Sequence, residues 1–262
     1  MDIKIYQVDA FANHIFEGNP AAVCPLDSWL PDTLMQRIAA ENNLSETAFF
    51  VEQACIFHIR WFTPAAEVNL CGHATLASAK IIFDELNFSQ PQIIFSSKSG
   101  KLLVSKQEEY LVMDFPAQLP IACETPEQLK EAFHHAPFQC FKHNDYFLIF
   151  SSEADITNAA PDMQLLREVD LRAVCISAAG EHYDFVSRCF APKYGIDEDP
   201  VTGSTFSQLA PYWSNVLNKK TLHAKQISAR GGEVNVQDLG DRVLISGKAV
   251  KYLSGTLSID LV

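Results

Sequence analysis

A thiol, a glycine and an imidazole stand together at Cys71-Gly72-His73, immediately before an apolar run from Ala74 to Phe88. A strand that ends near Cys71, a turn at Gly72 and a helix from Ala74 would bring the first free N–H groups of that helix beside both side chains. A helix N-terminus attracts anions through these donors and through the macrodipole. The stretch indicates an anion-binding helix start, and an ordinary strand-turn-helix corner is the alternative.

The second half of the chain contains a similar arrangement. Arg60-Trp61-Phe62-Thr63-Pro64 is echoed by Arg188-Cys189-Phe190-Ala191-Pro192. Each segment leads through an acidic loop to a glycine that begins an apolar helix, and we interpret the echo as an internal duplication. Two such helix ends facing one cleft would hold a small carboxylate. The N–H groups would come from Gly72 and His73 on one side, and from Gly203, Ser204 and Thr205 on the other.

A carboxylate held in this way makes the neighbouring carbon acidic, because the negative charge that develops there is stabilised. The reaction then needs a base and an acid close to that carbon. The titratable residues that flank the two turns, together with one acid earlier in the chain, are Glu46, Glu67, Cys71, His73, Asp197, Glu198 and Asp199.

Glu46 is one candidate acid/base, because it stands where a small polar loop runs into the apolar strand Ala48-Phe49-Phe50-Val51. A carboxylate against such a wall would lose water, which suits a proton shuttle near neutral pH. A solvated acid at a strand end is the alternative. His73 is either a helix-start donor or a capping and packing residue, and Asp199 either assists or only caps the second helix. Cys71 is either a thiolate favoured by the helix end or a core thiol.

Other site classes lack their markers. No HExxH or spaced Cys/His cluster indicates a metal. No GxGxxG or GxxxxGK[ST] indicates a nucleotide, and Ser204 is not in a GxSxG elbow. The prediction is a site without metal or cofactor.

Composition limits the classes of partner that the chain is expected to bind. The 262 residues are 48% apolar and 20% charged, which is typical of a soluble globular protein. Lys and Arg total 20 against 32 Asp and Glu, a formal charge of −12, which argues against nucleic acid or an anionic membrane as partner. The seven cysteines include no CxxC pair, and the first residues lack the apolar block of a signal peptide. We expect reduced cysteines, a cytoplasmic location and a small-molecule partner.

The helices and strands that must position these residues can be predicted from the spacing of apolar residues. Two apolar stretches, 74–88 and 204–217, predict core helices wrapped by strands. Alternating or continuous apolar runs predict strands at 3–10, 55–62, 92–97, 101–106, 110–115, 146–150, 173–177 and 184–190. We place a first half at 1–118 and a second at 119–262, and leave open a return of the last strand to the first half.

Seven ordered segments together carry a family resemblance. They are Asp9-Ala10-Phe11 with Gly18-Asn19-Pro20-Ala21-Ala22-Val23, Ser45-Glu46-Thr47-Ala48-Phe49, Arg60-Trp61-Phe62-Thr63-Pro64, Glu67 to Ala77, Phe190-Ala191-Pro192 with Gly195-Ile196, Glu198 to Ser204, and Arg230-Gly231-Gly232. In these the chain resembles the phenazine-biosynthesis PhzF-like isomerases, whose fold is shared with diaminopimelate epimerase. The resemblance implies an α+β fold of two pseudo-symmetric domains. Each would have a barrel-like, mostly antiparallel sheet around a central apolar helix, and the site would lie between them.

The resemblance also implies residue roles. Glu46 would be the principal acid/base of a cofactor-free proton transfer, with His73 and Asp199 assisting. The backbone at Gly72-His73 and Gly203-Ser204 would bind the substrate carboxylate. Asn19 stands where the related epimerases place a substrate-contacting asparagine. Members of the family are commonly dimers, so a homodimer is expected.

Two departures bear on the function. Many relatives continue the second motif with Ala-His, whereas this chain has Thr205-Phe206-Ser207-Gln208, which removes a polar group near the second helix start. Thr202 stands where two-thiol epimerases need a second cysteine. The leading prediction is an isomerase that moves a proton on a small carboxylated metabolite. The alternatives are an amino-acid racemase or epimerase using Cys71, and a binding protein that has lost turnover.

Overall fold

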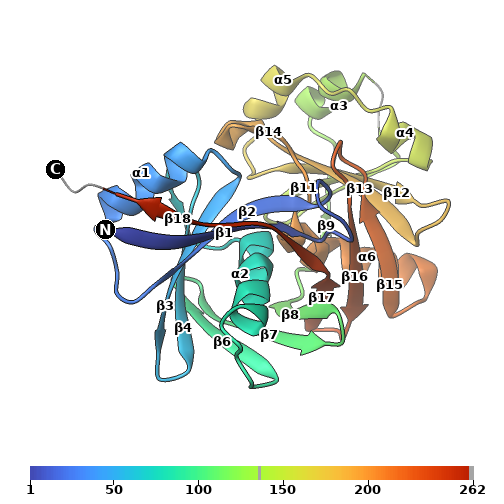
Figure 1. Ribbon diagram of the computed structural model, residues 1–262. Helices are drawn as coiled ribbons and strands as arrows, with labels where there is room; N and C mark the ends of the chain where they lie inside the picture. Colours follow the sequence, from blue (N-terminus) through green and yellow to red (C-terminus); the bar gives the residue numbers. More distant parts are fainter. Residues whose placement is uncertain (135–136, 260–262) are drawn as a thin grey trace. The chain divides into compact units, whose positions relative to one another are not determined.

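The computed structural model describes residues 1–134 and 137–259 (Figure 1). The chain forms two compact units. Unit 1 is Met1–Asp114 with the end of the chain from Ser246, and unit 2 is Phe115–Ile245. We predicted the division between the two halves at 118/119. The predicted second half, 119–262, includes residues 135–136 and 260–262, which lie outside the described residues. The last strand, whose place was left open, pairs in unit 1 with the first strand of the chain.

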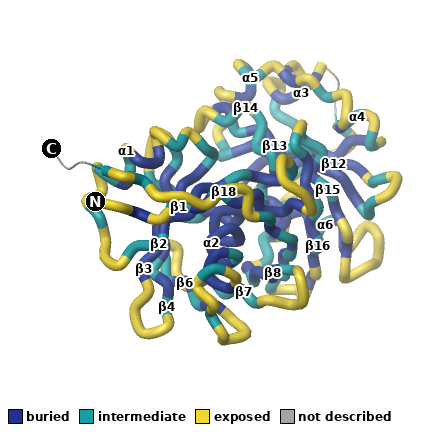
Figure 2. The backbone as a smooth tube through the Cα atoms, in the orientation of Figure 1, coloured by how far each residue is buried: buried dark blue, intermediate teal, exposed yellow. Residues whose placement is uncertain are grey.

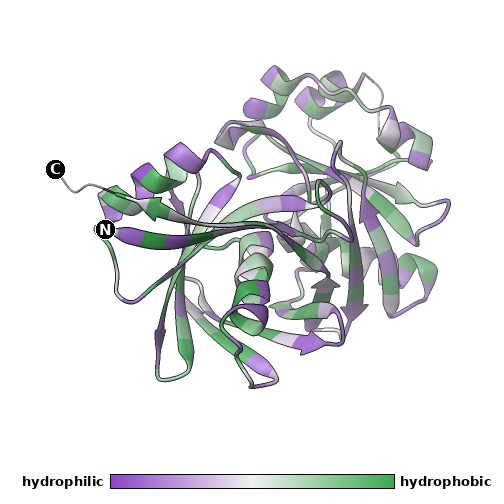
Figure 3. Cartoon of the chain, viewed as in Figure 1, coloured by the Kyte–Doolittle hydropathy of each residue, from purple (hydrophilic) through white to green (hydrophobic). Residues whose placement is uncertain are grey.

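The described residues of unit 1 form two helices and a larger set of strands. The helices are α1 (Asp32–Asn42) and α2 (Gly72–Asp84). The strands are β1 (Asp2–Ala10), β2 (Asn19–Leu26), β3 (Glu46–Gln53), β4 (Ile56–Phe62), β5 (Glu67–Val68), β6 (Gln92–Ser97), β7 (Gly100–Gln107), β8 (Tyr110–Pro116) and β18 (Ala249–Ser258). Helix α1 shows both hydropathy colours along its length (Figure 3) and buries Met35, Ile38 and Ala39. It is therefore an amphipathic covering helix.

Helix α2 is the central element of unit 1. It contacts β1, β2, β3 and β18, and nearly every residue from Gly72 to Phe83 is buried, as the dark tube in Figure 2 shows. Its two buried hydroxyl residues bond back to the preceding turn, Thr75 to the Cys71 carbonyl at 2.6 Å and Ser78 to the Ala74 carbonyl at 2.7 Å. The helix can thus be enclosed on all sides without an unpaired hydroxyl at these two positions. The predicted core helix is confirmed.

Unit 2 is built in the same manner around α6 (Phe206–Leu217), which follows the short η2 (Gly203–Thr205). Trp213 stacks on Phe185 at 5.6 Å, and its indole nitrogen donates to Ser177 at 2.9 Å. The other helices are α3 (Glu127–Phe133), α4 (Glu153–Thr157), α5 (Met163–Arg167) and η1 (Pro192–Tyr194). The strands are β9 (Ile121–Ala122), β10 (Gln139–Lys142), β11 (Tyr146–Ile149), β12 (Val174–Ala179), β13 (Phe185–Ala191), β14 (Ile196–Asp199), β15 (Thr221–Gln226), β16 (Gly232–Asp238) and β17 (Arg242–Gly247).

Strand pairing repeats between the two units. In unit 1 the pairs β1/β2, β3/β4, β4/β5 and β6/β7 are antiparallel, and β2/β3 and β4/β6 are parallel. In unit 2 the pairs β10/β11, β12/β13, β13/β14 and β15/β16 are antiparallel, and β11/β12 and β13/β15 are parallel. The same series of pairings occurs twice, with α2 and α6 at the same place in each. The duplication predicted from the sequence echo is confirmed.

The arginine of each echo segment holds the loop that leads to the central helix. Arg60 donates to both carboxylate oxygens of Glu67 at 2.8 Å. Arg188 donates to both oxygens of Glu198 at 2.7 and 2.8 Å. Each glutamate precedes the helix-opening glycine by five positions. These two acids were considered as proton-transfer candidates, and their bidentate pairing gives them a positioning role instead.

No helix among residues 1–134 and 137–259 has both the length and the apolar character needed to span a membrane.

Breaking the Arg188–Glu198 pair should destabilise the fold. Arg188→Met leaves a mostly buried Glu198 (21% exposed) without its cation and removes donors from the Ile156 and Ala159 carbonyls. We expect a loss on the order of 2 kcal/mol in the free energy of unfolding, measured by urea denaturation.

Arg167→Met is the matched control, because Arg167 and its partner Asp197 are 57% and 61% exposed. An exposed pair contributes little, so this variant should unfold close to the wild type. Equal midpoints for both variants would contradict the positioning role.

Candidate active site

Glu46 is the first residue of β3, and it lies at the edge of an apolar wall. The five residues that follow it, from Thr47 to Val51, are all buried. β3 runs parallel to β2, with Ala21 opposite Glu46, and Glu46 itself is 9% exposed. The strand start thus places a carboxylate in a largely apolar environment, as the sequence predicted.

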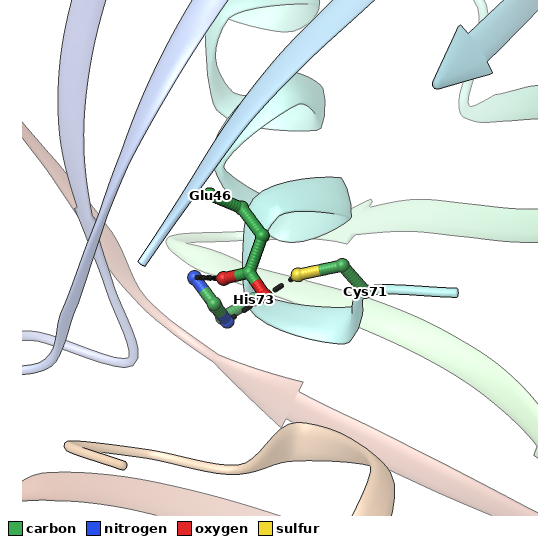
Figure 4. A group of neighbouring side chains, drawn as sticks. All are labelled: Glu46, Cys71 and His73. Atoms are coloured by element: carbon green, nitrogen blue, oxygen red, sulfur yellow. Dashed lines mark hydrogen bonds and ion pairs between the residues drawn. The ribbon is translucent and has the colours of Figure 1, made fainter. Parts of the chain in front are cut away.

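His73 lies in the first turn of α2 and meets Glu46 there. Its Nε2 is 3.1 Å from Glu46 Oε2, with the two side chains 6% and 12% exposed. Figure 4 shows the imidazole and the carboxylate facing each other. The two residues, 27 positions apart in the sequence, form a buried acid–base pair. Two of the three predicted catalytic residues are therefore brought together within unit 1.

The opposite ring nitrogen of His73 faces Asn19 and Cys71. Asn19 Nδ2 lies 3.3 Å from Nδ1 and Cys71 Sγ lies 3.5 Å from it. Asn19 opens β2 and is fully buried, and Cys71 is the residue immediately before α2. Amide oxygen and nitrogen exchange places on a 180° turn, so Asn19 is able to serve either a neutral or a protonated imidazole.

The charge of His73 follows from its surroundings. Burial lowers the pKa of the imidazole, but Cys71 and Glu46 raise it by more, so that the pKa lies well above its usual value. Cys71 is a neutral thiol near pH 7, as shown below, and the charge that stabilises the imidazolium there is the Glu46 carboxylate. The direction of this shift favours the protonated imidazole.

Cys71 is not a thiolate at neutral pH. Burial, and then the nearby Glu46 carboxylate, raise the pKa of the Cys71 thiol to about 11, against the lowering effect of His73. Of the two alternatives for Cys71, the raised pKa favours the core thiol, because desolvation outweighs the helix end. All seven cysteines are free.

Glu46, Cys71 and His73 also have the donor types of a metal site, with donor atoms within 4.8 Å of one another. Their orientation, however, puts the carboxylate and the thiol at opposite ring nitrogens. Glu46 faces Nε2 while Cys71 faces Nδ1, and a metal ion would have to take one ring nitrogen together with both other ligands. The arrangement fits proton transfer better than it fits metal binding.

The remaining predicted residues lie in unit 2. Asp199 ends β14 and accepts a hydrogen bond from the Thr202 hydroxyl at 2.6 Å. Thr205 donates its hydroxyl to the Thr202 carbonyl at 2.8 Å, and Gly203 is buried. Ser204 accepts a hydrogen bond from Arg172 at 3.1 Å. That these residues share a site with Glu46 stays a prediction.

Phe206 is fully buried and packs against Phe185 at 6.0 Å between ring centroids. Its side chain faces the core, and the effect of the missing polar group on the substrate stays a prediction. The contact of Arg172 with Ser204 is marked by no sequence motif.

Comparisons with known proteins agree on one family. The family described as "Phenazine biosynthesis-like protein" matches residues 8–255. An uncharacterized isomerase of Pseudomonas aeruginosa is 48% identical over 259 residues, covering 99% of this chain and 100% of the relative. The crystal structure of a phenazine biosynthesis protein of the PhzF family from Enterococcus faecalis superposes with a TM-score of 0.96 at 42% identity, covering 99% and 100% of the two chains. A probable proline racemase from Agrobacterium radiobacter shares the fold, with a TM-score of 0.64 at 10% identity over 99% and 93% of the chains. The predicted α+β, diaminopimelate epimerase-like fold is confirmed.

The protonated state of Cys71 can be tested by alkylation. Peptide mapping after brief iodoacetamide treatment near pH 7.5 should find Cys55, which is exposed, modified first. Cys71 should stay unmodified, because it is 7% exposed and its pKa is raised to about 11. In the Cys55→Ser variant the exposed thiol is gone, so slow labelling of the other cysteines can be followed without its signal. Rapid modification of Cys71 at this pH would show that a thiolate is present after all.

Proposed function

The chain belongs to the phenazine biosynthesis-like family and is an isomerase, and we propose that it moves a proton on a small carboxylated metabolite without a cofactor. Glu46 is the acid/base of this proposal and His73 its partner. The observation that carries it is the contact of 3.1 Å between the two side chains in a largely buried position.

The chemistry follows from the charges of the pair. A carboxylate beside a substrate C–H group takes the proton, and negative charge develops on the substrate carbon framework. Glu46 is neutral once it has taken the proton, so the His73 imidazolium no longer faces a negative charge there. The negative charge on the substrate then takes the place of the carboxylate charge in this poorly solvated site. Returning the proton from Glu46 to a different carbon completes an isomerisation. Charge is conserved within the site at every step.

The start of α2 supports a carboxylated substrate. Its cap residue, Cys71, makes no side-chain capping hydrogen bond, so the Gly72 and His73 N–H groups are suited to an anion. These N–H groups and the positive end of the helix dipole favour an anion locally in a chain whose net charge is −12.

The other assignments belong to the same proposal. Asn19 contacts substrate or sets the protonation of His73 through its amide. Asp199 assists, and the Gly203, Ser204 and Thr205 segment of unit 2 binds substrate. The family resemblance supports these roles.

Glu46→Gln should abolish proton transfer. The test incubates the protein in heavy water with a mixture of small carboxylated metabolites and reads deuterium incorporation by mass spectrometry. General acid/base catalysis contributes about 10²–10⁴ in rate, so the exchange seen with the wild type should fall by that order in the variant.

Glu52→Gln is the matched control, since Glu52 lies on the same strand and is exposed; it should exchange like the wild type. Cys71→Ala should retain most of the exchange. Loss of exchange in Cys71→Ala with retention in Glu46→Gln would instead support a thiol-based racemase. Binding without exchange in the wild type would support a binding protein.

A further inference from the structure

Unit 2 contains two pairs of cysteines that face each other across neighbouring strands. Cys123 directly follows β9, and Cys140 lies in β10, with 3.5 Å between the two sulfur atoms. Cys175 of β12 stands opposite Cys189 of β13, with 2.7 Å between the sulfur atoms. All four are free cysteines, so each pair is a reduced dithiol.

The backbone places Cys123 directly opposite Cys140. β9 and β10 are antiparallel, with Ala122 paired to Phe141, and the next pair in this register is Cys123 with Cys140. The Cys123 N–H donates to the Cys140 carbonyl at 3.0 Å, which continues the ladder by one step. Opposite residues of an antiparallel pair have Cα atoms about 4.5–5.5 Å apart, and a disulfide needs about 4.4–6.8 Å. The two sulfur atoms can therefore bond without a change in strand pairing.

The two pairs differ in whether solvent reaches them. Cys123 is partly exposed, whereas Cys140 is 5% exposed and belongs to the hydrophobic core of unit 2. Cys175 and Cys189 are each 1% exposed. A dissolved oxidant has to reach a sulfur atom before it can react. Of the two pairs, the first offers it one accessible sulfur atom with a second thiol directly behind, and the other pair is sealed.

The surroundings of Cys140 give the two thiols of the first pair different roles. Burial, and then the neighbouring Cys123, raise the pKa of the Cys140 thiol to about 12, against the lowering effects of Thr125 and Lys142. Cys140 is consequently protonated near neutral pH and is a poor first nucleophile. The part of this rise that comes from Cys123 disappears once the Cys123 sulfur is bonded to another sulfur and carries no charge. Cys140 thus loses its proton more easily after Cys123 has reacted.

We propose that Cys123 and Cys140 form a reversible redox modification site that is oxidised by low-molecular-weight disulfides, with glutathione disulfide as the probe. The Cys123 thiolate attacks one sulfur of the oxidant, so that a mixed disulfide forms and one glutathione thiolate leaves. Cys140 then gives up its proton and attacks the Cys123 sulfur, and the second glutathione thiolate leaves. Two cysteine thiols are oxidised to one disulfide. One glutathione disulfide is reduced to two thiols, which take up the two protons.

The new bond would fasten β9 to the rest of unit 2. This strand has two residues, Ile121 and Ala122, which are both exposed and pair with β10. A disulfide between positions 123 and 140 closes a loop that contains α3, and closing a loop stabilises the folded chain against the unfolded one. Oxidation should therefore protect this short strand from opening. The site goes beyond the proposed proton transfer, because Glu46 and His73 belong to unit 1.

Peptide mapping of the whole protein tests the site. The reduced protein is treated with glutathione disulfide, the remaining thiols are blocked with N-ethylmaleimide in denaturant, and the peptides are mapped without reduction. A peptide that links Cys123 to Cys140 is expected, lighter by two hydrogen atoms than the two reduced peptides together, and dithiothreitol should remove it. Cys175 and Cys189 should carry the blocking group. Cys55, which is exposed and has no thiol neighbour among the described residues, should carry glutathione without a link.

Three variants separate the two steps. Cys140→Ser should trap the mixed disulfide, so that glutathione on Cys123 rises about tenfold or more above the wild-type level. Cys123→Ser should leave Cys140 in the blocked form, because the oxidant cannot reach it. Cys55→Ser is the matched control, since it removes an exposed thiol of unit 1, and it should form the link at the wild-type rate.

Limited proteolysis tests the effect on β9. Thermolysin should cut the reduced protein beside Ile121, which is 63% exposed, and should cut the oxidised protein more slowly. Cys140→Ser treated with glutathione disulfide should be cut as fast as the untreated variant. Equal cleavage of the reduced and oxidised wild type would overturn the protection of β9.

Absence of the Cys123–Cys140 link, or a Cys175–Cys189 link that forms before it, would overturn the modification site. Equal glutathione on Cys123 in the wild type and in Cys140→Ser would overturn the role of Cys140 as the second nucleophile. A link that survives dithiothreitol would overturn the reversibility. All of these readouts are taken without turnover, so the site stands or falls separately from the effect of Glu46→Gln on exchange.

Discussion

The buried contact between Glu46 and His73 is the interaction on which the rest of this structure depends. Two opposite charges removed from water cost free energy, and their attraction repays it only when the geometry is well fixed. Unit 1 provides that geometry from two rigid elements, the start of β3 and the first turn of an enclosed helix. The Arg60–Glu67 pair holds the loop between them. The contact is expensive for the fold, and such sites are where proteins place proton chemistry.

The duplicated architecture explains how one chain obtains two kinds of charged site. Both units use the same strand pairings and the same arginine–glutamate pair before a glycine. They differ in what stands beside the helix start. Unit 1 has a carboxylate and an imidazole, and unit 2 has a guanidinium backed by a buried aspartate. A repeated frame thus carries different charged groups beside the two helix starts.

Much of this could be predicted from the sequence, because the signals were local. The apolar runs after Gly72 and Gly203 indicated the enclosed helices, and the repeated Arg-x-Phe-x-Pro indicated the duplication. Glu46 was a candidate because an apolar strand follows it directly, and the family resemblance gave it the role of principal acid/base. Arg172 could not be found, since it meets Ser204 across 32 positions through a parallel register that no short motif encodes. The burial of Phe206 against Phe185 could not be predicted either, because its partner lies on a distant strand.

The most direct test of the charge pair is the ¹⁵N spectrum of the His73 ring followed over pH, with assignment from His73→Gln. The account predicts that His73 remains an imidazolium well above pH about 6.5, the value for an unperturbed histidine, and that Glu46→Gln lowers its pKa because burial is then opposed less. A raised pKa also means that the stability His73 contributes is complete below that pH and is lost as pH rises through the folded-state value. A neutral His73 ring at pH about 6.5 in the wild type, or a titration that Glu46→Gln leaves unchanged, would contradict the account.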